Sequence, residues 1–255
     1  MARDLEEYLR PELKMTPFCP GCGHGILMNL ILRAIDSSGI SMRDLLFVSG
    51  IGCGAWIPSP NFRGDTLHTL HGRAIPFAVG AKSFKPDLKT MVISGDGDIT
   101  SIGGNHLIHA ARRDIDLTVI CANNMIYGMT GGQIASTSPL GAMSSTTASG
   151  NPYHPFDLID LVSGAGAKYA ARYSVTQPMP LMETIKKYLK LKHFTFIEVL
   201  SPCHTQFGRR NNSDSPVQML KRLMENCVTR DEAAKLDKDS LSTKIVTGEW
   251  NHGEP

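Results

Sequence analysis

The segment Met91-Val92-Ile93-Ser94-Gly95-Asp96-Gly97-Asp98 decides the fold, because a short apolar run passes directly into glycines and carboxylates. Short apolar runs that end in turn residues are typical of buried strands. Three more segments show the same pattern. The predicted strands are Leu45–Val48, Met91–Ile93, Leu117–Cys121 and Phe194–Leu200.

The segments between these strands have the apolar spacing of helices. The expected helices cover Ile26–Ile35, Ala74–Phe84, Gly103–Arg113, Pro155–Gly164 and Leu181–Leu191. Alternating strands and helices predict an α/β fold, with a mostly parallel sheet, helices on both faces and right-handed crossovers.

Composition narrows the classes of partner. The chain has 255 residues, 42% of them hydrophobic, and 26 basic against 24 acidic residues give a formal charge of +2 without any block of like charges. This balance predicts no nucleic-acid binding and no anionic membrane surface as a partner. The polar start of the chain and the lack of a segment long enough to span a bilayer predict a soluble, cytoplasmic protein.

Polar side chains follow the predicted strands where they end. Parallel sheets bind ligands at the carboxyl ends of their strands, so Asp96 and Asn124, 28 residues later, are expected to lie close together. Their oxygens suit Mg²⁺, with the backbone carbonyl of Ile126 as a third ligand. Gly97 and Asp98 open a helix whose amides can face an anion. The alternative is a plain turn and a capping asparagine, which the spacing of one crossover disfavours.

Four of the six cysteines are predicted to converge. Cys19 and Cys22 form a C-x₂-C pair before a helix, and Cys53 and Cys203 each follow a strand at the same sheet edge. This spacing alone does not choose between a structural zinc ion and an iron–sulfur cluster. Their position beside a phosphate-binding edge favours an electron carrier over zinc.

These motifs together resemble a known family. Gly95-Asp96-Gly97 followed by Asn123-Asn124 resembles the signature of thiamine-diphosphate enzymes, in which the aspartate and the second asparagine bind magnesium. With the cysteines and the stretches CPGCGHG, LHGRAIPFAVG and IYGMTGGQ, residues 16–212 resemble the β subunit of 2-oxoacid:ferredoxin oxidoreductases. The resemblance implies a [4Fe-4S] cluster on Cys19, Cys22, Cys53 and Cys203.

The resemblance also implies the residues that hold thiamine diphosphate. His71 is expected to touch the cofactor as a catalytic residue; the alternative is a histidine that caps or satisfies the core. Residues 1–212 would form the domain that binds thiamine diphosphate and the cluster, and residues 213–255 a helical and extended tail packed on a partner. The expected contacts are Ile51, Gly52, Cys53, Gly54, His71, Gly97, Asp98, Gly128 and Met129.

The implied reaction is oxidative decarboxylation of a 2-oxoacid, with coenzyme A as acyl acceptor and ferredoxin as electron acceptor. The chain has room only for the diphosphate-binding half, so an α subunit is expected to supply the pyrimidine-side glutamate and the coenzyme A site. The segment from Ser201 to Asn211 resembles the 2-oxoglutarate branch, and Arg209 and Arg210 could pair with a substrate carboxylate or be solvated. Pyruvate, a branched-chain 2-oxoacid, or a non-redox thiamine enzyme with structural zinc are the alternatives.

Overall fold

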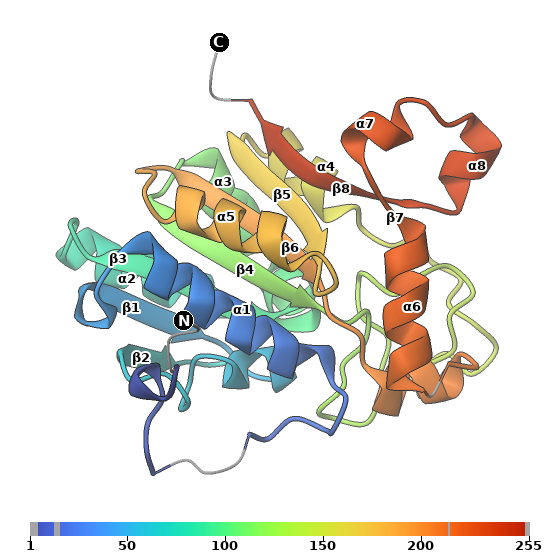
Figure 1. The fold of residues 1–255 in the computed structure, drawn as a ribbon, viewed down its shortest axis with the longest axis horizontal. Helices are drawn as coiled ribbons and strands as arrows, with labels where there is room; N and C mark the ends of the chain where they lie inside the picture. The colour runs from blue at the N-terminus through green and yellow to red at the C-terminus, as the bar shows by residue number, and fades with distance from the viewer. Residues whose placement is uncertain (1–4, 13–15, 214, 253–255) are drawn as a thin grey trace.

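A single eight-stranded sheet forms the centre of the computed structural model, which describes residues 5–12, 16–213 and 215–252 (Figure 1). The strand order is β2-β1-β3-β4-β6-β5-β8-β7, and all neighbours are parallel except the antiparallel pair β5 and β8. The strands are β1 (Leu45–Ser49), β2 (Asp65–His68), β3 (Lys89–Gly95), β4 (Leu117–Asn123), β5 (Tyr169–Ser174), β6 (Phe194–Leu200), β7 (Cys227–Thr229) and β8 (Ile245–Asn251).

Helices cover both faces of this sheet (Figure 1). One layer contains α1 and α5, and the opposite layer contains α2, α3 and α4. Burial on both faces explains why the central strands are apolar at nearly every position instead of alternating. The helices are α1 (Gly23–Ser38), α2 (Ala74–Phe84), α3 (Gly104–Arg112), α4 (Leu158–Gly164) and α5 (Pro178–Tyr188).

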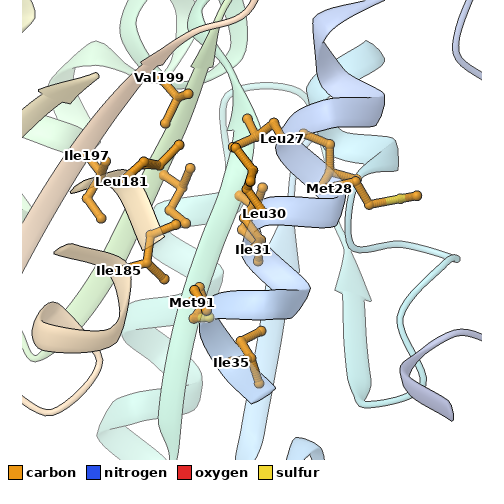
Figure 2. Close-up of a cluster of buried hydrophobic side chains, with 14 of the residues drawn as sticks. Leu27, Met28, Leu30, Ile31, Ile35, Met91, Leu181, Ile185, Ile197 and Val199 are labelled. Carbon is orange, nitrogen blue, oxygen red and sulfur yellow. The ribbon is translucent and has the colours of Figure 1, made fainter. Parts of the chain in front are cut away.

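The layer that α1 and α5 form against the sheet is the larger of two buried clusters (Figure 2). Ile31 of α1 and Ile185 of α5 are fully buried there, together with Met91 of β3. The next residue of β3, Val92, points into the opposite layer, as the period of two in a strand requires. Both layers therefore fix β3, and with it the position of the loop that follows at residue 95.

The predicted α/β class and the mostly parallel sheet are confirmed. The four predicted strands are present, but the sheet also contains β2, β5, β7 and β8, which the sequence analysis did not predict. Arg172 interrupts the apolar run in β5, and Gly248 and Glu249 interrupt β8. Neither strand therefore has the continuous apolar pattern that identified the others.

Helix boundaries differ from the prediction in two places that matter for the site. A π-helical turn, Gly97–Ile102, precedes α3, so the helix predicted from Gly103 is preceded by a wider turn directly after Asp96. Such turns are frequent at functional sites. The helix predicted from Pro155 begins at Leu158, because the Asp157 side chain accepts hydrogen bonds from the amides of Ile159 and Asp160 and caps it.

The chain after residue 212 forms α6 (Pro216–Asn226), β7, α7 (Arg230–Ala233), α8 (Lys238–Ser242) and β8. It extends the sheet through β8, which pairs with β5. Packing of this segment on a partner stays a prediction. Within the described residues, every helix is too short or too polar to cross a bilayer.

Replacing Ile31 with alanine should remove about 2–5 kcal/mol from the free energy of unfolding, because the side chain is fully buried and leaves a cavity. Urea denaturation measures the loss. The control is Ile26→Ala on the same helix, where the side chain is 37% exposed and the loss should be much smaller. Equal losses in the two variants would contradict the packing of α1 described above.

Candidate functional site

A cavity opens at the carboxyl ends of β1, β3 and β4. It is formed by the loop after β1, the turn around His71, the π-helical turn after β3 and the loop after β4. Parallel sheets bind ligands at this edge. The lining includes each predicted cofactor contact and the three predicted magnesium ligands: Ile51, Gly52, Cys53, Gly54, His71, Asp96, Gly97, Asp98, Asn124, Ile126, Gly128 and Met129.

Asp96 and Asn124 are brought together as the spacing predicted. The amide of Asn124 donates to Oδ1 of Asp96 at 3.5 Å, and the hydroxyl of Thr137 donates to Oδ2. The Asp96 side chain is almost completely buried, and this burial raises its pKa to about 6. A divalent cation at this point would stabilise the charged carboxylate, which makes Asp96 and Asn124 suitable for Mg²⁺.

Asp98 lies two residues away and has a different role. Its Oδ1 accepts hydrogen bonds from the amides of Ile51 at 3.1 Å and Gly72 at 2.7 Å, and from Nδ1 of His71 at 2.5 Å. Its Oδ2 is buried without a partner among the described residues. The carboxylate therefore ties two loops to the π-helical turn, and a contact of Asp98 with a bound anion would have to come from its backbone.

His71 is held by two neighbours. With Nδ1 hydrogen-bonded to Asp98, Nε2 is the nitrogen that remains for a ligand in the cavity. The ring packs edge-on against Tyr127, with ring centroids 5.8 Å apart, and the Tyr127 hydroxyl donates to the carbonyl of Gly97 at 2.9 Å. His71 is thus a fixed polar group in the cavity wall that also partners the buried Asp98, and its contact with the cofactor stays a prediction.

The four predicted cysteine ligands line a second cavity of about 270 Å³. The Cys22 amide donates to the Cys19 carbonyl at 2.9 Å, and the Gly23 amide donates to the Pro202 carbonyl at 3.1 Å, which joins the first cysteine loop to the segment before Cys203. Burial raises the pKa of Cys22 to about 12 and that of Cys53 to about 11. These thiols would ionise only beside a strong positive charge, as metal ligands do.

The four cysteines do not form a ready-made site for a single metal ion. Among the residues that the structure describes, no three His, Cys, Asp or Glu side chains come close enough to hold one metal ion. A tetrahedral zinc site requires Zn–S distances of about 2.3 Å, which places its sulfur atoms roughly 3.8 Å apart. The described cysteines therefore do not form a preformed zinc tetrahedron, and the group that they would hold stays a prediction.

The two cavities adjoin each other. Both are lined by Cys53, Asn124, Gly128 and Met129. A methyl group placed on Gly128 would lie 3.6 Å from Sγ of Cys53, 3.7 Å from Sγ of Cys203 and 3.6 Å from the side-chain nitrogen of Asn124. The side of Gly128 that a side chain would occupy therefore faces the candidate magnesium ligand and two candidate cluster ligands.

Comparison with known proteins identifies the family. Residues 51–199 match the family described as thiamine pyrophosphate enzyme, C-terminal TPP binding domain. The chain is 49% identical to 2-oxoglutarate synthase subunit KorB of Methanothermobacter thermautotrophicus, over 97% of this chain and 87% of that protein, and 46% identical to the same subunit of Methanocaldococcus jannaschii, over 96% and 90%. This chain belongs to the 2-oxoacid:ferredoxin oxidoreductase β subunits.

A solved structure supports the same assignment. It is named 2-oxoglutarate:ferredoxin oxidoreductase from Magnetococcus marinus with 2-oxoglutarate, coenzyme A and succinyl-CoA bound. The TM-score is 0.85 at 29% identity, with 100% of this chain and 86% of that chain covered. The chain is therefore one subunit of a multisubunit oxidoreductase, with a thiamine pyrophosphate binding domain.

The two predicted substrate arginines, Arg209 and Arg210, do not line either cavity. Neither is among the described residues that line them. Arg210 donates hydrogen bonds to the carbonyl and side chain of Gln206, at 3.0 and 2.6 Å, and to the Gly131 carbonyl at 3.0 Å. Arg209 is exposed. A contact with substrate stays a prediction for both, and Arg210 braces the glycine-rich loop.

Sequence reasoning missed several residues of the site. Thr137 holds Asp96 but lies 41 residues further along in an irregular loop, where no motif identifies it. Tyr127 and Thr130 line the cavity and belong to the stretch IYGMTGGQ, from which the sequence analysis named only Ile126, Gly128 and Met129. Tyr127 and Thr130 are close to Gly128 in the sequence, but this closeness alone does not show which residues of the stretch line the cavity.

Asp98→Ala should lower the free energy of unfolding by about 3 kcal/mol, because it leaves buried donors from two loops without an acceptor. Asp98→Asn is the matched control. Its amide oxygen can keep the role of Oδ1 while the NH₂ takes the place of the unpartnered Oδ2, so its loss should be less than half as large. Urea denaturation of both variants decides, and equal losses would contradict the assignment.

Proposed function

We propose that this chain binds Mg²⁺ and thiamine diphosphate at the carboxyl ends of β3 and β4, and carries a [4Fe-4S] cluster on Cys19, Cys22, Cys53 and Cys203. It would act as the β subunit of a 2-oxoglutarate:ferredoxin oxidoreductase. The observation that carries the proposal is the shared wall of the two cavities, formed by Cys53, Asn124, Gly128 and Met129. A site that oxidises a thiamine-bound substrate one electron at a time needs this proximity.

The magnesium ion would take Oδ of Asp96, Oδ1 of Asn124 and the carbonyl of Ile126. Three protein oxygens leave room for diphosphate oxygens and water in an octahedral shell. The Asp96 carboxylate is buried and its pKa is raised to about 6, so the cation and the carboxylate would stabilise each other. The amides that open the π-helical turn at Gly97 would face the remaining phosphate charge.

Each side chain of the site would have a simple task. When bound, thiamine diphosphate supplies carbanion chemistry for decarboxylating a 2-oxoacid, and a [4Fe-4S] cluster supplies a one-electron acceptor. His71 would present Nε2 to the reacting end of the cofactor, with its orientation set by Asp98. The Gly128 loop would keep water out of the space between the two cofactors.

Partners complete the reaction. An α subunit would supply the pyrimidine-side glutamate and the coenzyme A site, and ferredoxin would take the electrons in the cytoplasm. The names of the relatives and of the M. marinus structure, which contain 2-oxoglutarate, coenzyme A and succinyl-CoA, support 2-oxoglutarate as substrate over pyruvate or branched-chain 2-oxoacids. The segment after residue 212 would pack on the α subunit.

Asp96→Ala in the co-purified complex should abolish Mg²⁺-dependent binding of thiamine diphosphate, since the diphosphate charge loses a metal ligand. Isothermal titration with the cofactor, with and without Mg²⁺, measures this. The control is Asp87→Ala, an exposed carboxylate just before the amino end of the same strand. Unchanged affinity in the Asp96 variant would refute the magnesium assignment.

Cys203→Ala should remove the cluster and stop the reduction of ferredoxin or of a viologen dye. Anaerobically purified wild-type complex should contain iron and acid-labile sulfide, and the variant should lose the iron of this chain. Cys227→Ser is the control, because Cys227 lies outside the cavity that the four cysteines line. Zinc in place of iron in the wild-type protein would overturn the cluster assignment and support a structural metal.

A further inference from the structure

A buried chain of charged and polar side chains runs through the sheet to the loop after β4. Glu198 lies in the middle of β6, between β4 and β5, and is 3% exposed. Its Oε1 accepts from Nδ2 of Asn123 at 2.7 Å, and its Oε2 accepts from Nε of Arg172 at 2.7 Å. Arg172 also donates a hydrogen bond at 2.8 Å to Asp157, which caps α4.

The cost of this arrangement calls for an explanation. A buried ion pair contributes little to stability, and apolar side chains of similar size often serve as well or better. Burial disfavours the charge of Arg172, but the carboxylates of Glu198 and Asp157 outweigh it and raise the pKa of Arg172 above its ordinary value. The guanidinium thus stays charged and compensates Glu198. The position of Glu198 and Arg172 next to Asn123 indicates that they act on the turn after β4.

This series of hydrogen-bonded side chains ends at the turn after β4, which carries two candidate magnesium ligands, Asn124 and Ile126. Nδ2 of Asn123 donates to Glu198, so Oδ1 of Asn123 faces the other way and accepts a hydrogen bond from the amide of Met125 at 2.9 Å. Met125 adopts a left-handed backbone with φ of 63°, which a residue with a side chain seldom adopts without support. The Ser138 hydroxyl donates to the Met125 carbonyl at 2.6 Å and supports it from the other side.

This left-handed residue places the residues on either side of it next to each other. The Ile126 amide donates to Oδ1 of Asn124 at 3.2 Å, so the side chain of Asn124 and the backbone of Ile126 meet at the cavity. If Asn123 turned its amide by 180°, an NH₂ group would face the Met125 amide and the turn would lose its acceptor. The orientation of the Asn123 carboxamide therefore supports the conformation of the turn.

We infer that Glu198, with Arg172 as its countercharge, is a positioning residue for the metal site, which acts by locking the carboxamide of Asn123. The inference rests on the proposed binding of Mg²⁺ and thiamine diphosphate by this chain. It gives the first asparagine of the Asn123-Asn124 pair a role: Asn124 faces the ion, and Asn123 connects its turn to the centre of the sheet.

The decisive variant is Asn123→Asp in the co-purified complex. An aspartate has no N–H for Glu198, so two carboxylates would meet in a buried space. We expect thiamine diphosphate affinity at saturating Mg²⁺ to fall by about 10- to 100-fold, the usual range for loss of a group that orients metal ligands. Calorimetric titration gives the affinity, and the half-saturating Mg²⁺ concentration should rise with it.

A second substitution should reverse the effect. In Asn123→Asp combined with Glu198→Gln, the new glutamine can donate its NH₂ to the aspartate and accept from Nε of Arg172, so each hydrogen bond is restored with its direction reversed at one position. The double variant should regain most of the lost affinity. If it binds as weakly as the single variant, Glu198 does not act through residue 123 and the inference fails.

A control separates positioning from general stability. Asp116→Asn breaks the ion pair of Lys82 and Asp116, which measures 2.7 Å and lies at the amino ends of the strands. It should lower the melting temperature without changing cofactor affinity. An Asn123→Asp protein that loses melting temperature but keeps its affinity would overturn the inference.

Two further outcomes are informative. If Asn123→Asp does not fold, Glu198→Gln alone tests the same interaction. The NH₂ group of the new glutamine must face one of two donors, Nδ2 of Asn123 or Nε of Arg172, so the affinity for thiamine diphosphate should again fall. Unchanged affinity in that variant would contradict the positioning role. If the wild-type complex itself shows no Mg²⁺-dependent binding of thiamine diphosphate, the proposed function fails and this inference fails with it.

Discussion

The burial of carboxylates at the ends of parallel strands is the constraint on which this molecule depends. Asp96 and Asp98 are separated by one glycine, and both are almost completely buried. Oδ1 of Asp98 accepts from donors of two loops, whereas Asp96 accepts from Thr137 and the Asn124 amide and has a pKa raised by burial. Asp98 organises the loops of the site, and Asp96 leaves a negative charge that a cation can compensate. The π-helical turn after β3 makes this division possible.

Much of the site could be predicted from the sequence, because its residues follow strands that are identified by continuous apolar runs. Asp96 follows β3 and Asn124 follows β4, and a single crossover brings neighbouring parallel strands to one edge. Cys53 and Cys203 follow β1 and β6 at the same edge. The prediction needed only strand ends and parallel order, and both are set by hydrophobic pattern and by the handedness of the chain.

The sequence could not predict lateral contacts between strands that are distant in the chain. Glu198 reads as an interruption in an apolar run, and nothing near it identifies Arg172 or Asn123 as its partners. β5 and β8 were missed for a similar reason. Arg172 of β5 is satisfied by Glu198 of the neighbouring strand and Glu249 of β8 by Thr184 and Lys187 of α5, and such polar residues look like loop residues in isolation. Thr137 depends on the path of a long irregular loop, which short-range pattern does not encode.

The shared wall of the two cavities links these observations. A side chain on Gly128 would meet the Asn124 side chain and the sulfur atoms of Cys53 and Cys203, so it would occupy the space between the candidate magnesium site and the thiols. The turn that presents Asn124 is fixed from the sheet by Asn123, and the Gly131 carbonyl three residues beyond Gly128 is fixed by Arg210. Hydrogen bonds therefore hold both ends of this short loop. A loop held at both ends would keep the two proposed cofactors at a constant separation.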